Sequence, residues 1–152
     1  MPAKGDYPIP KFHFRVEWGD DARIGFTEVS GLEFETEVIE YREGSSKKYN
    51  PSKQPGLTKF SDVTLKRGTF EGDFDFYESW KQTYYFQEGN TTGSLYRRTV
   101  NIKLLNEVHE PIITWTLENA WPRKVRYAEL KAGSSELLIE EMVLVHEGLT
   151  VR

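Results

Sequence analysis

The side chains that could perform catalysis or bind a metal are few and widely separated. The chain has no cysteine, which excludes thiol nucleophiles, disulfides and thiolate zinc sites. Its histidines, His13, His109 and His146, are isolated from one another, and none forms the HExxH pattern that places two zinc ligands on one helix face. The sequence also lacks a G-x-S-x-G elbow, a Walker loop and a G-x-G-x-x-G fingerprint. We therefore expect a protein that is not an enzyme, with no catalytic residues, no cofactor and no metal ion.

Carboxylates form one regular pattern. Glu33, Glu35 and Glu37 recur at every second position, which places them on the same face of a β-strand. A catalytic carboxylate needs an apolar pocket that raises its pKa, and this open stripe does not indicate such a pocket. Glu140 and Glu141 are adjacent, so they point to opposite faces of a strand and cannot act as a pair. The stripe is typical of a solvated outer face or of a wall that faces a water-filled channel.

The elements that carry these side chains are mostly β-strands. In residues 11–18 and 97–105, apolar and polar side chains alternate with the period of two that predicts a half-buried strand. Residues 73–86 instead show aromatic side chains at helical spacing, so one helix is expected there. The other expected strands are residues 23–29, 32–42, 62–67, 112–121, 124–130 and 136–147. This pattern predicts a mainly β fold: a two-sheet β-sandwich or partly closed barrel with one flanking α-helix.

The length and charge of the chain limit its function further. A chain of 152 residues fits a single domain, in which the proline-rich residues 1–10 are expected to form an extended N-terminal arm. The formal net charge of −4 argues against a specific nucleic-acid site, which normally has a basic face. We expect no membrane segment and no signal peptide, because the sequence has neither a long apolar run nor the apolar core of a signal.

Residues 44–61 are the least regular part of the chain. They contain two prolines, two glycines and four lysines, with few apolar side chains. A loop of this length inside a compact domain is uncommon and is usually functional or disordered. We expect it to protrude and to become ordered on contact with a neighbouring molecule. A flexible loop in solvent is the alternative.

The last quarter of the chain, residues 115–149, is predicted to contain strands joined by turns, with no residues suited to an active site. The final strand, residues 136–147, has apolar side chains on both faces, and such a strand should be covered on both sides. This quarter, through its final strand and the corner at residues 119–122, is therefore predicted to form core and intersubunit wall in one element. The candidates are Trp115, Trp121, Ile139, Met142 and Leu144.

Short motifs along the chain occur in an order that resembles a known family. They are YREG at 41–44, PG at 55–56, LKRG at 65–68, RRTVNI at 97–102, WTLENAWP at 115–122 and HEGL at 146–149. In this order and spacing, the sequence resembles the inner tube proteins of contractile phage tails. It looks closest to the tube subunits of phage-tail-like extracellular contractile injection systems. The resemblance covers nearly the whole chain.

The resemblance implies a structural function. A tail-tube subunit forms homohexameric rings that stack into a conduit, and contraction of a sheath drives this helical assembly into a target to deliver payload. The implied partners are further copies of the chain, a contractile sheath protein, baseplate and cap proteins, and a tape-measure or payload protein in the lumen. The resemblance also implies assembly in the bacterial cytoplasm and later release as part of a phage-tail-like particle.

Under this resemblance, residues 44–61 become the ring-stacking loop and the acidic stripe becomes a candidate lumen wall. The ring-stacking candidates are Lys47, Lys48, Tyr49, Pro51, Pro55, Gly56 and Leu57. A closed ring also removes the exposed strand edges that make a monomeric sheet prone to aggregate. The alternative function is a monomeric β-barrel module that binds a ligand among its aromatic side chains, with residues 44–61 as a lid.

Overall fold

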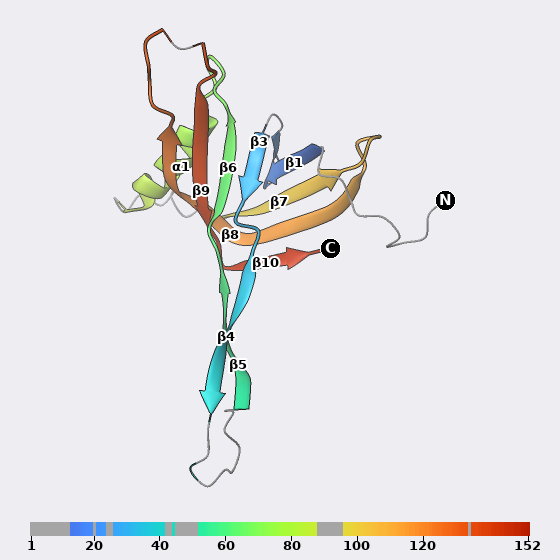
Figure 1. Cartoon of the computed structure of the whole chain (residues 1–152). Coiled ribbons are helices and arrows are strands. Elements are labelled where there is room, and N and C mark those ends of the chain that lie inside the picture. Colours follow the sequence, from blue (N-terminus) through green and yellow to red (C-terminus); the bar gives the residue numbers. More distant parts are fainter. Residues whose placement is uncertain are drawn as a thin grey trace.

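The computed structural model describes residues 13–19, 21–23, 26–41, 44, 52–87, 96–133 and 135–152. Within these ranges the strands build a curved body, one helix flanks it, and a two-stranded hairpin projects from it (Figure 1). The strands are β1 (His13–Trp18), β2 (Asp21–Arg23), β3 (Phe26–Ser30), β4 (Phe34–Tyr41), β5 (Ser52–Phe60), β6 (Val63–Gly68), β7 (Arg98–Leu105), β8 (Pro111–Tyr127), β9 (Ile139–Val145) and β10 (Gly148–Val151). The helix, α1, spans Asp75–Gln87.

The body is one strongly curved antiparallel sheet. Its strand order is β2-β1-β7-β8-β9-β6-β3, and β10 pairs with β8 off this path. Strand β8 joins the two halves of this sheet. Its first part pairs with β7 and β10, and its second part pairs with β9. The hairpin of β4 and β5 is a second, separate sheet. The expected mainly β fold with two sheets and one helix is confirmed, and the barrel is open rather than closed.

The core lies between the two halves of the body, where alternating strand positions point inward. Val16 and Trp18 of β1 and Val100 and Ile102 of β7 are buried, as their alternation predicts. Full burial of one such side chain stabilises a fold by about 1.5–3 kcal/mol. The other members of the buried cluster are Phe26, Val63, Leu65, Phe76, Leu117, Ala120, Met142, Leu144 and Leu149.

The structure has one long strand where the sequence predicts two. Residues 112–121 and 124–130 are expected as separate strands, but β8 runs without a break from Pro111 to Tyr127. The pairing of β8 with β9 shifts register between Pro122 and Lys124. Pro122, which has no N–H to donate to a ladder, therefore lies at an irregularity, as its chemistry predicts.

The end of the chain also differs from the prediction. Strand β9 covers only part of the expected 136–147, and a further short strand, β10, follows it. Within β9, Glu140, Met142 and Leu144 are buried, and the positions between them are half-buried. Leu137 lies before the strand and is exposed, so the prediction that the apolar strand begins at residue 136 is wrong. The reason is that β8 already ends at Tyr127, so the ladder between β8 and β9 does not extend to Leu137.

Helix α1 is held against the body by its first turns. Asp73 Oδ1 accepts a hydrogen bond from the backbone N–H of Asp75 at 3.1 Å, which satisfies a donor at the start of the helix. Phe76 is fully buried and stacks on Phe26 of β3, with the ring centroids 5.9 Å apart. The expected flanking helix at 73–86 is thus present, displaced by one or two residues at its ends.

The largest difference from the predictions concerns residues 44–61. They are expected to form an irregular loop, but residues 52–60 form β5, which pairs with β4 as an antiparallel hairpin. Pro55 lies opposite Val38 at a shift of register, and a proline is tolerated at such an irregularity. Four of the residues proposed for ring stacking lie outside the described residues: Lys47, Lys48, Tyr49 and Pro51.

Candidate assembly surfaces

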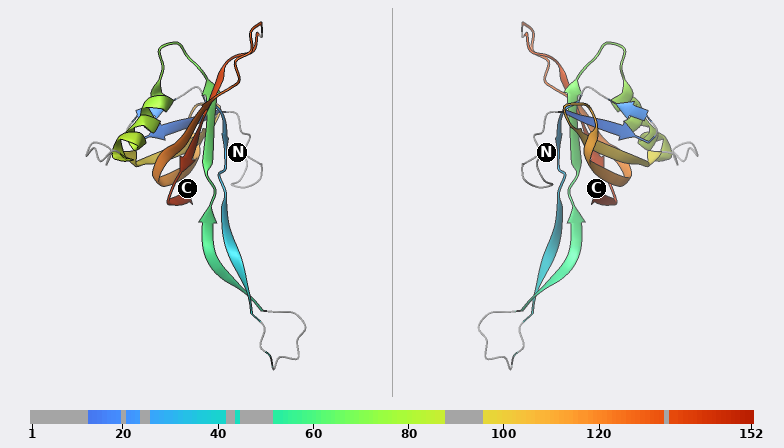
Figure 2. Two further views of the ribbon diagram at one scale, coloured as in Figure 1. Left: turned by 90° about the vertical axis from the view of Figure 1, so that its left-hand side faces the viewer. Right: turned by 90° about the vertical axis from the view of Figure 1, so that its right-hand side faces the viewer.

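The β4–β5 hairpin, the arm, leaves the body through a narrow neck (Figure 2). Gly31 has a φ of 88° there, and a Cβ on it would overlap the carbonyl oxygen of Asp62, so only glycine fits. Ser61 Oγ donates a hydrogen bond to Glu33 Oε2 at 3.1 Å. His146 Nε2 lies 2.9 Å from the Ser61 carbonyl oxygen. Close backbone approach and side-chain hydrogen bonds therefore set the direction of the arm.

One face of the arm is mostly apolar. Residues directly opposite each other in an antiparallel ladder share a face. The pairs on this face are Phe34 with Phe60, Thr36 with Thr58, and Val38 with Pro55. Phe34 is 63% exposed and Val38 is 62% exposed, so the arm presents this apolar face to solvent in a single copy.

The opposite face of the arm carries the acidic stripe, and a lysine of the same arm partly neutralises it. Lys59 forms an ion pair with Glu37 and lies opposite Glu35 in the ladder. The hydrogen bond with Glu37 is the main cause of a raised pKa for Lys59, and the charge of Glu37 adds to it. Ile39, farther along this face, is also exposed.

Among the described residues, no third strand or helix supports the arm. An isolated two-stranded hairpin is marginally stable in water, and a third strand or a packed helix is needed to stabilise it. Leu57 is 73% exposed, and Tyr41 at the far end is more than half exposed. Apolar side chains gathered on an exposed surface mark an interaction site. The arm is therefore the first candidate assembly surface.

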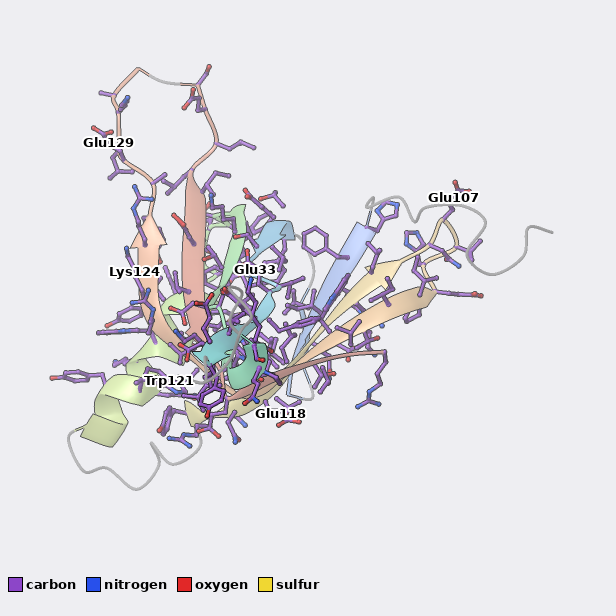
Figure 3. All side chains as sticks on the ribbon, turned by 60° about the horizontal axis from the view of Figure 1, so that its bottom comes forward. Glu33, Glu107, Glu118, Trp121, Lys124 and Glu129 are labelled. Atoms are coloured by element: carbon purple, nitrogen blue, oxygen red, sulfur yellow. The ribbon has the colours of Figure 1, made fainter. Side chains whose placement is uncertain are left out.

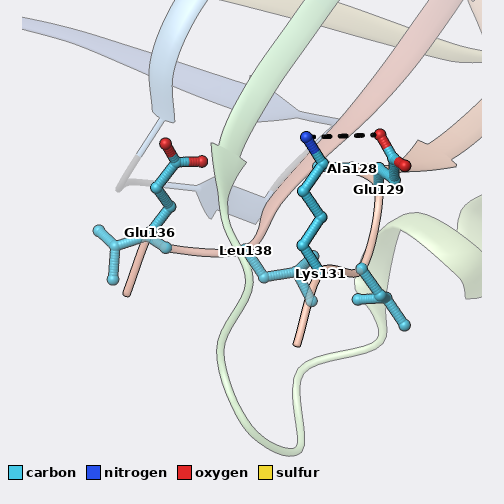
Figure 4. Close-up of a pocket in the computed structure, with 7 residues that line it drawn as sticks. Ala128, Glu129, Lys131, Glu136 and Leu138 are labelled. Atoms are coloured by element: carbon cyan, nitrogen blue, oxygen red, sulfur yellow. Dashed lines mark ion pairs between the residues drawn. The ribbon is translucent and has the colours of Figure 1, made fainter. Parts of the chain in front are cut away.

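A second projection, the tip (residues 128–133 and 135–138), leaves the opposite end of the body (Figure 1). The backbone bond at its base runs from the Ala128 N–H to the Ile139 carbonyl oxygen at 2.9 Å. Residues 128–131 and 136–138 line a hollow, where Lys131 Nζ lies 4.0 Å from Glu129 Oε2 (Figure 4). In Figure 3, Glu129 lies out on the tip, whereas Glu33 lies near the base of the arm.

A third surface is an apolar groove on the open side of the body. It lies where β3 passes β1, β7 and β8, and it is lined by Phe14, Thr27, Glu28, Val29, Leu32, Ile102, Leu104 and Trp115. Most of these side chains are apolar, and Glu28 lies 3.6 Å from Lys66 in an ion pair. The groove therefore suits an apolar occupant, and it is where a ligand-binding module would hold its ligand.

A buried ion-pair cluster connects α1 to the body. Arg67 of β6 donates a hydrogen bond to Glu140 Oε1 of β9 at 2.6 Å and another to Asp73 Oδ1 at 3.0 Å. Its guanidinium carbon lies 4.3 Å from the Phe76 ring centroid. Burial alone would lower the pKa of Arg67, but the hydrogen bonds to Glu140 and Asp73 outweigh burial and raise it. These charge-assisted bonds hold the start of the helix in place.

The outer face of α1 presents aromatic side chains to solvent. The rings of Tyr77 and Trp80 are stacked with centroids 6.4 Å apart, and those of Trp80 and Tyr84 with centroids 6.2 Å apart. Phe74, just before the helix, is also exposed. Phe76 instead points toward the body, where it is fully buried against Phe26.

The residues predicted for core and intersubunit wall lie at different depths. Met142 and Leu144 are fully buried inside one copy. Trp115 lines the groove, Trp121 is half-buried in the body (Figure 3), and Ile139 is half-buried where β9 meets the tip. The structure therefore does not gather these residues on one surface.

Two kinds of site are not found in the described part of the chain. Its histidine, aspartate and glutamate side chains form no group of three or more that could hold a metal ion. Within the same residues, no helix is long and apolar enough to cross a membrane.

Sequence reasoning missed three of these features. Strand β5 has no clear strand signal, because Pro55 and Gly56 lie within it and the apolar Leu57 and Phe60 are three positions apart rather than two. The exposure of the tip was missed because Leu137 and Leu138 continue the apolar pattern of β9. No sequence signal shows that Arg67 meets Glu140, because the two residues are far apart in the chain and meet only through the pairing of β6 with β9.

Comparison with solved structures relates this arrangement to tube proteins. A chain of an extracellular contractile injection system, in the PVC sheath-tube complex in the extended state, is 28% identical, with a TM-score of 0.80 over 97% of this chain and 93% of that chain. A chain of the anti-feeding prophage cap, the tube-terminating cap, is 29% identical, with a TM-score of 0.79 over 100% of this chain and 99% of that chain. Hcp1 from Flavobacterium johnsoniae, at 13% identity and a TM-score of 0.56 over 92% of this chain and 94% of that chain, shares the fold. A comparison with curated protein sequences finds no match.

The sequence itself matches one family over nearly its whole length. Residues 10–150 match the family described as T4-like virus tail tube protein gp19, and this range includes the body, the arm and the tip. The chain therefore belongs to the T4-like virus tail tube protein gp19 family, and it is a structural tube subunit homologous to those of contractile, phage-tail-like systems.

Proposed function

We propose that the protein forms homohexameric rings and that these rings stack into the inner tube of a contractile injection system. A surrounding sheath drives the tube into a target, and the tube delivers a payload. The arm is the observation that carries this proposal, because it is exposed in a single copy and one of its faces is mostly apolar. A tube subunit has further copies of itself as neighbours, and these can cover the arm.

The open edges of the body support ring formation. Among the described strands, the sheet path ends at β2 and β3, and β10 pairs only with β8, so each of these strands has an edge that its own sheet does not pair. Unpaired edges promote association, and closure into a ring covers them. Rings that stack head to tail without closing form an open filament. Obligate interfaces of this kind bury more than about 2,000 Å² and are largely apolar, as the arm and the groove are.

The related structures support the choice of partners. One relative lies in a sheath-tube complex, another in a tube-terminating cap and a third in a sheath/tube terminator. By analogy, this subunit contacts a contractile sheath along the tube and cap and baseplate proteins at the ends. A tape-measure or payload protein occupies the lumen. The subunit has no enzymatic activity, assembles in the bacterial cytoplasm and becomes part of a released particle.

Within the tube, the arm is the proposed ring-stacking element, and Pro55, Gly56 and Leu57 lie on it. The acidic stripe of Glu33, Glu35 and Glu37 is proposed to face the lumen or to flank an intersubunit contact. Exposure of Glu35 in a single copy is compatible with either position. A structure of the assembled tube that places the stripe on the sheath-facing surface would exclude the lumen assignment.

Electron microscopy of the purified protein tests the proposal directly. Rings or tubes about 100 Å wide are expected, from six domains of roughly 30 Å diameter each. Removal of residues 44–61 should leave rings intact and prevent their stacking. Monomers alone at every concentration, in micrographs and in light scattering, would contradict the proposal.

The ligand-binding alternative draws on the apolar groove. It predicts a monomer that binds an apolar small molecule, with the groove as the site. Removal of residues 44–61 would then abolish ligand binding rather than ring stacking, so one deletion distinguishes the two functions.

A further inference from the structure

The neck of the arm is a break in the strand pairing. The ladder between β3 and β6 in the body ends at Ser30, and the ladder of the arm begins at Phe34. Residues 31–33 and 61–62 belong to none of the described strand pairs. The direction in which the arm leaves the body (Figure 2) therefore depends on close packing at Gly31 and on side-chain contacts at the neck.

His146, which directly follows β9, connects the neck to the body. Its Nε2 lies 2.9 Å from the carbonyl oxygen of Ser61, and its Nδ1 lies 3.2 Å from the carbonyl oxygen of Gly148. The ring also packs against Phe60 of β5, with the ring centroids 5.7 Å apart. One imidazole ring thus links the base of the arm to the start of β10.

Both ring nitrogens of His146 face acceptors. A carbonyl oxygen can only accept a hydrogen bond, and a neutral imidazole has one N–H donor and one acceptor nitrogen. In a neutral ring, one nitrogen would therefore direct its lone pair at a carbonyl oxygen, and the two would repel each other. A ring protonated on both nitrogens donates to both carbonyl oxygens, and its charge strengthens both bonds. We infer that His146 is a positioning residue whose doubly protonated ring fixes the direction of the arm.

The charged groups around His146 leave room for a positive charge on its ring. Four carboxylates and two arginines lie on the segments next to the neck and to the turn between β9 and β10. They are Glu33, Asp62, Glu118, Glu147, Arg97 and Arg123. Each arginine forms an ion pair with one of these carboxylates, at 2.9 Å and 2.7 Å. Neither arginine therefore adds an uncompensated positive charge beside the ring.

The direction of the pH effect follows from the number of hydrogen bonds. Histidine side chains change charge between about pH 5 and pH 8. At the acidic end of this range the ring of His146 has both protons and makes both bonds. At the alkaline end it keeps one proton, and one of the two bonds is lost. The arm should therefore point in one direction at low pH and move more freely as pH rises.

This inference rests on the proposed tube function in one respect. An arm that is held in its bound direction loses less freedom when it meets a neighbouring copy, and such preorganisation favours binding. Stacking should accordingly become weaker as pH rises. The direction of the arm itself can be measured in a single copy, whether or not tubes form.

The distance between two spin labels measures the direction of the arm. The chain has no cysteine of its own, so Leu57→Cys on the arm and Thr99→Cys in β7, both at exposed positions, each take one label. The labelled protein is diluted with unlabelled protein and kept below the concentration at which tubes form. A narrow distance distribution is expected at about pH 6 and a broader one at about pH 8. Identical distributions at the two pH values would overturn the inference.

Two further variants test whether His146 is the group that titrates. His146→Gln has an uncharged side chain at every pH, so its distance distribution should be broad at both pH values. His13→Gln combined with His109→Gln removes the other two histidines and is the matched control, which should keep the wild-type change. Circular dichroism checks that each variant is folded. A distribution that still broadens with pH in His146→Gln would assign the effect to another group and overturn the inference.

Tube formation provides the second measurement. The protein concentration that wild type needs for tubes should rise by about threefold or more between pH 6 and pH 8, as expected for one lost hydrogen bond. In His146→Gln this concentration should not change with pH. Tubes together with a label distance that is independent of pH would overturn the role of His146 and leave the tube function intact. A wild-type protein that never forms rings would contradict the tube function, while the label distances would still decide the role of His146.

Discussion

The body and the arm differ in where their apolar side chains are buried. In the body, Val63 and Leu65 are fully buried within one copy. In the arm, Phe34, Val38 and Leu57 remain more than half exposed. The body is thus stabilised by its own chain, whereas burial of the arm requires another molecule. This difference means that folding and assembly depend on separate residues and can be changed separately by mutation.

The largest expected effect is a loss of folding stability in the body. Glu140→Ala removes the buried partner of Arg67 and leaves that cation with Asp73 alone. Breaking a buried pair destabilises a protein by roughly 3–5 kcal/mol. Because the contact with Asp73 remains, the expected loss of unfolding free energy is at the lower end, about 3 kcal/mol. Denaturant unfolding of monomeric protein measures the change.

The control for this variant is its neighbour in β9. Glu141 points to the other face and pairs with the exposed Arg126 at 2.9 Å, so Glu141→Ala should cost about 1 kcal/mol or less. Equal losses in the two variants would show that burial is not what distinguishes the two carboxylates.

The next effect concerns the neck between the two regions. Gly31→Ala places a side chain at a φ of 88° and against the Asp62 carbonyl oxygen. The left-handed backbone alone costs about 1–2 kcal/mol, and the overlap raises the loss of unfolding free energy above that value. The control is Gly72→Ala, which has a φ of 79° and a Cβ position with no described atom of another residue within 4 Å. A loss no larger than in this control would mean that the neck has room to adjust.

A smaller effect on stability is expected in the arm, together with a large effect on assembly. Val38→Asp changes a side chain that is 62% exposed, so the unfolding free energy should change by about 0.5 kcal/mol or less. Tube formation, followed by light scattering and microscopy, should nevertheless be lost. A variant that is strongly destabilised as a monomer, or that assembles normally, would remove the proposed separation between body and arm.

The smallest effect is a pH dependence in the body. Burial, and then the negative charge of Glu140, raise the pKa of Tyr127 above its usual 10.0. Between the unfolded and folded pKa values the native state binds more protons, so stability falls as pH rises above about 10. Tyr127→Phe should show a shallower decrease in Tm over that range. An unchanged slope would assign the alkaline sensitivity to other groups.

Local patterns in the sequence predict much of the body. Alternation in β1 and β7 identifies Val16, Ile102 and Leu104 as buried positions, and all three are buried. The aromatic spacing of residues 73–86 predicts α1, and Pro122 predicts an irregularity in β8. These signals are local, since each depends only on how neighbouring side chains divide between the two faces of one element.

The arm and the tip depend on pairing between distant residues. Residues 52–60 have weak strand propensity, because Pro55 and Gly56 lie among them, and they become a strand only because β4 lies beside them. Leu137 continues the apolar pattern of β9, but β8 ends too early to pair with it. The contact between Arg67 and Glu140 likewise follows from strand order.

The sequence by itself determined a mainly β, tube-type subunit without the motifs of an enzyme. Only the tertiary structure decided which apolar residues are buried in the core of one copy and which can be buried only by a neighbouring molecule. The physical reason is that hydrophobic stabilisation depends on surface removed from water. A leucine in the body and a leucine on the arm have the same sequence signal, and only the packing around each one shows which of them is buried in a single copy.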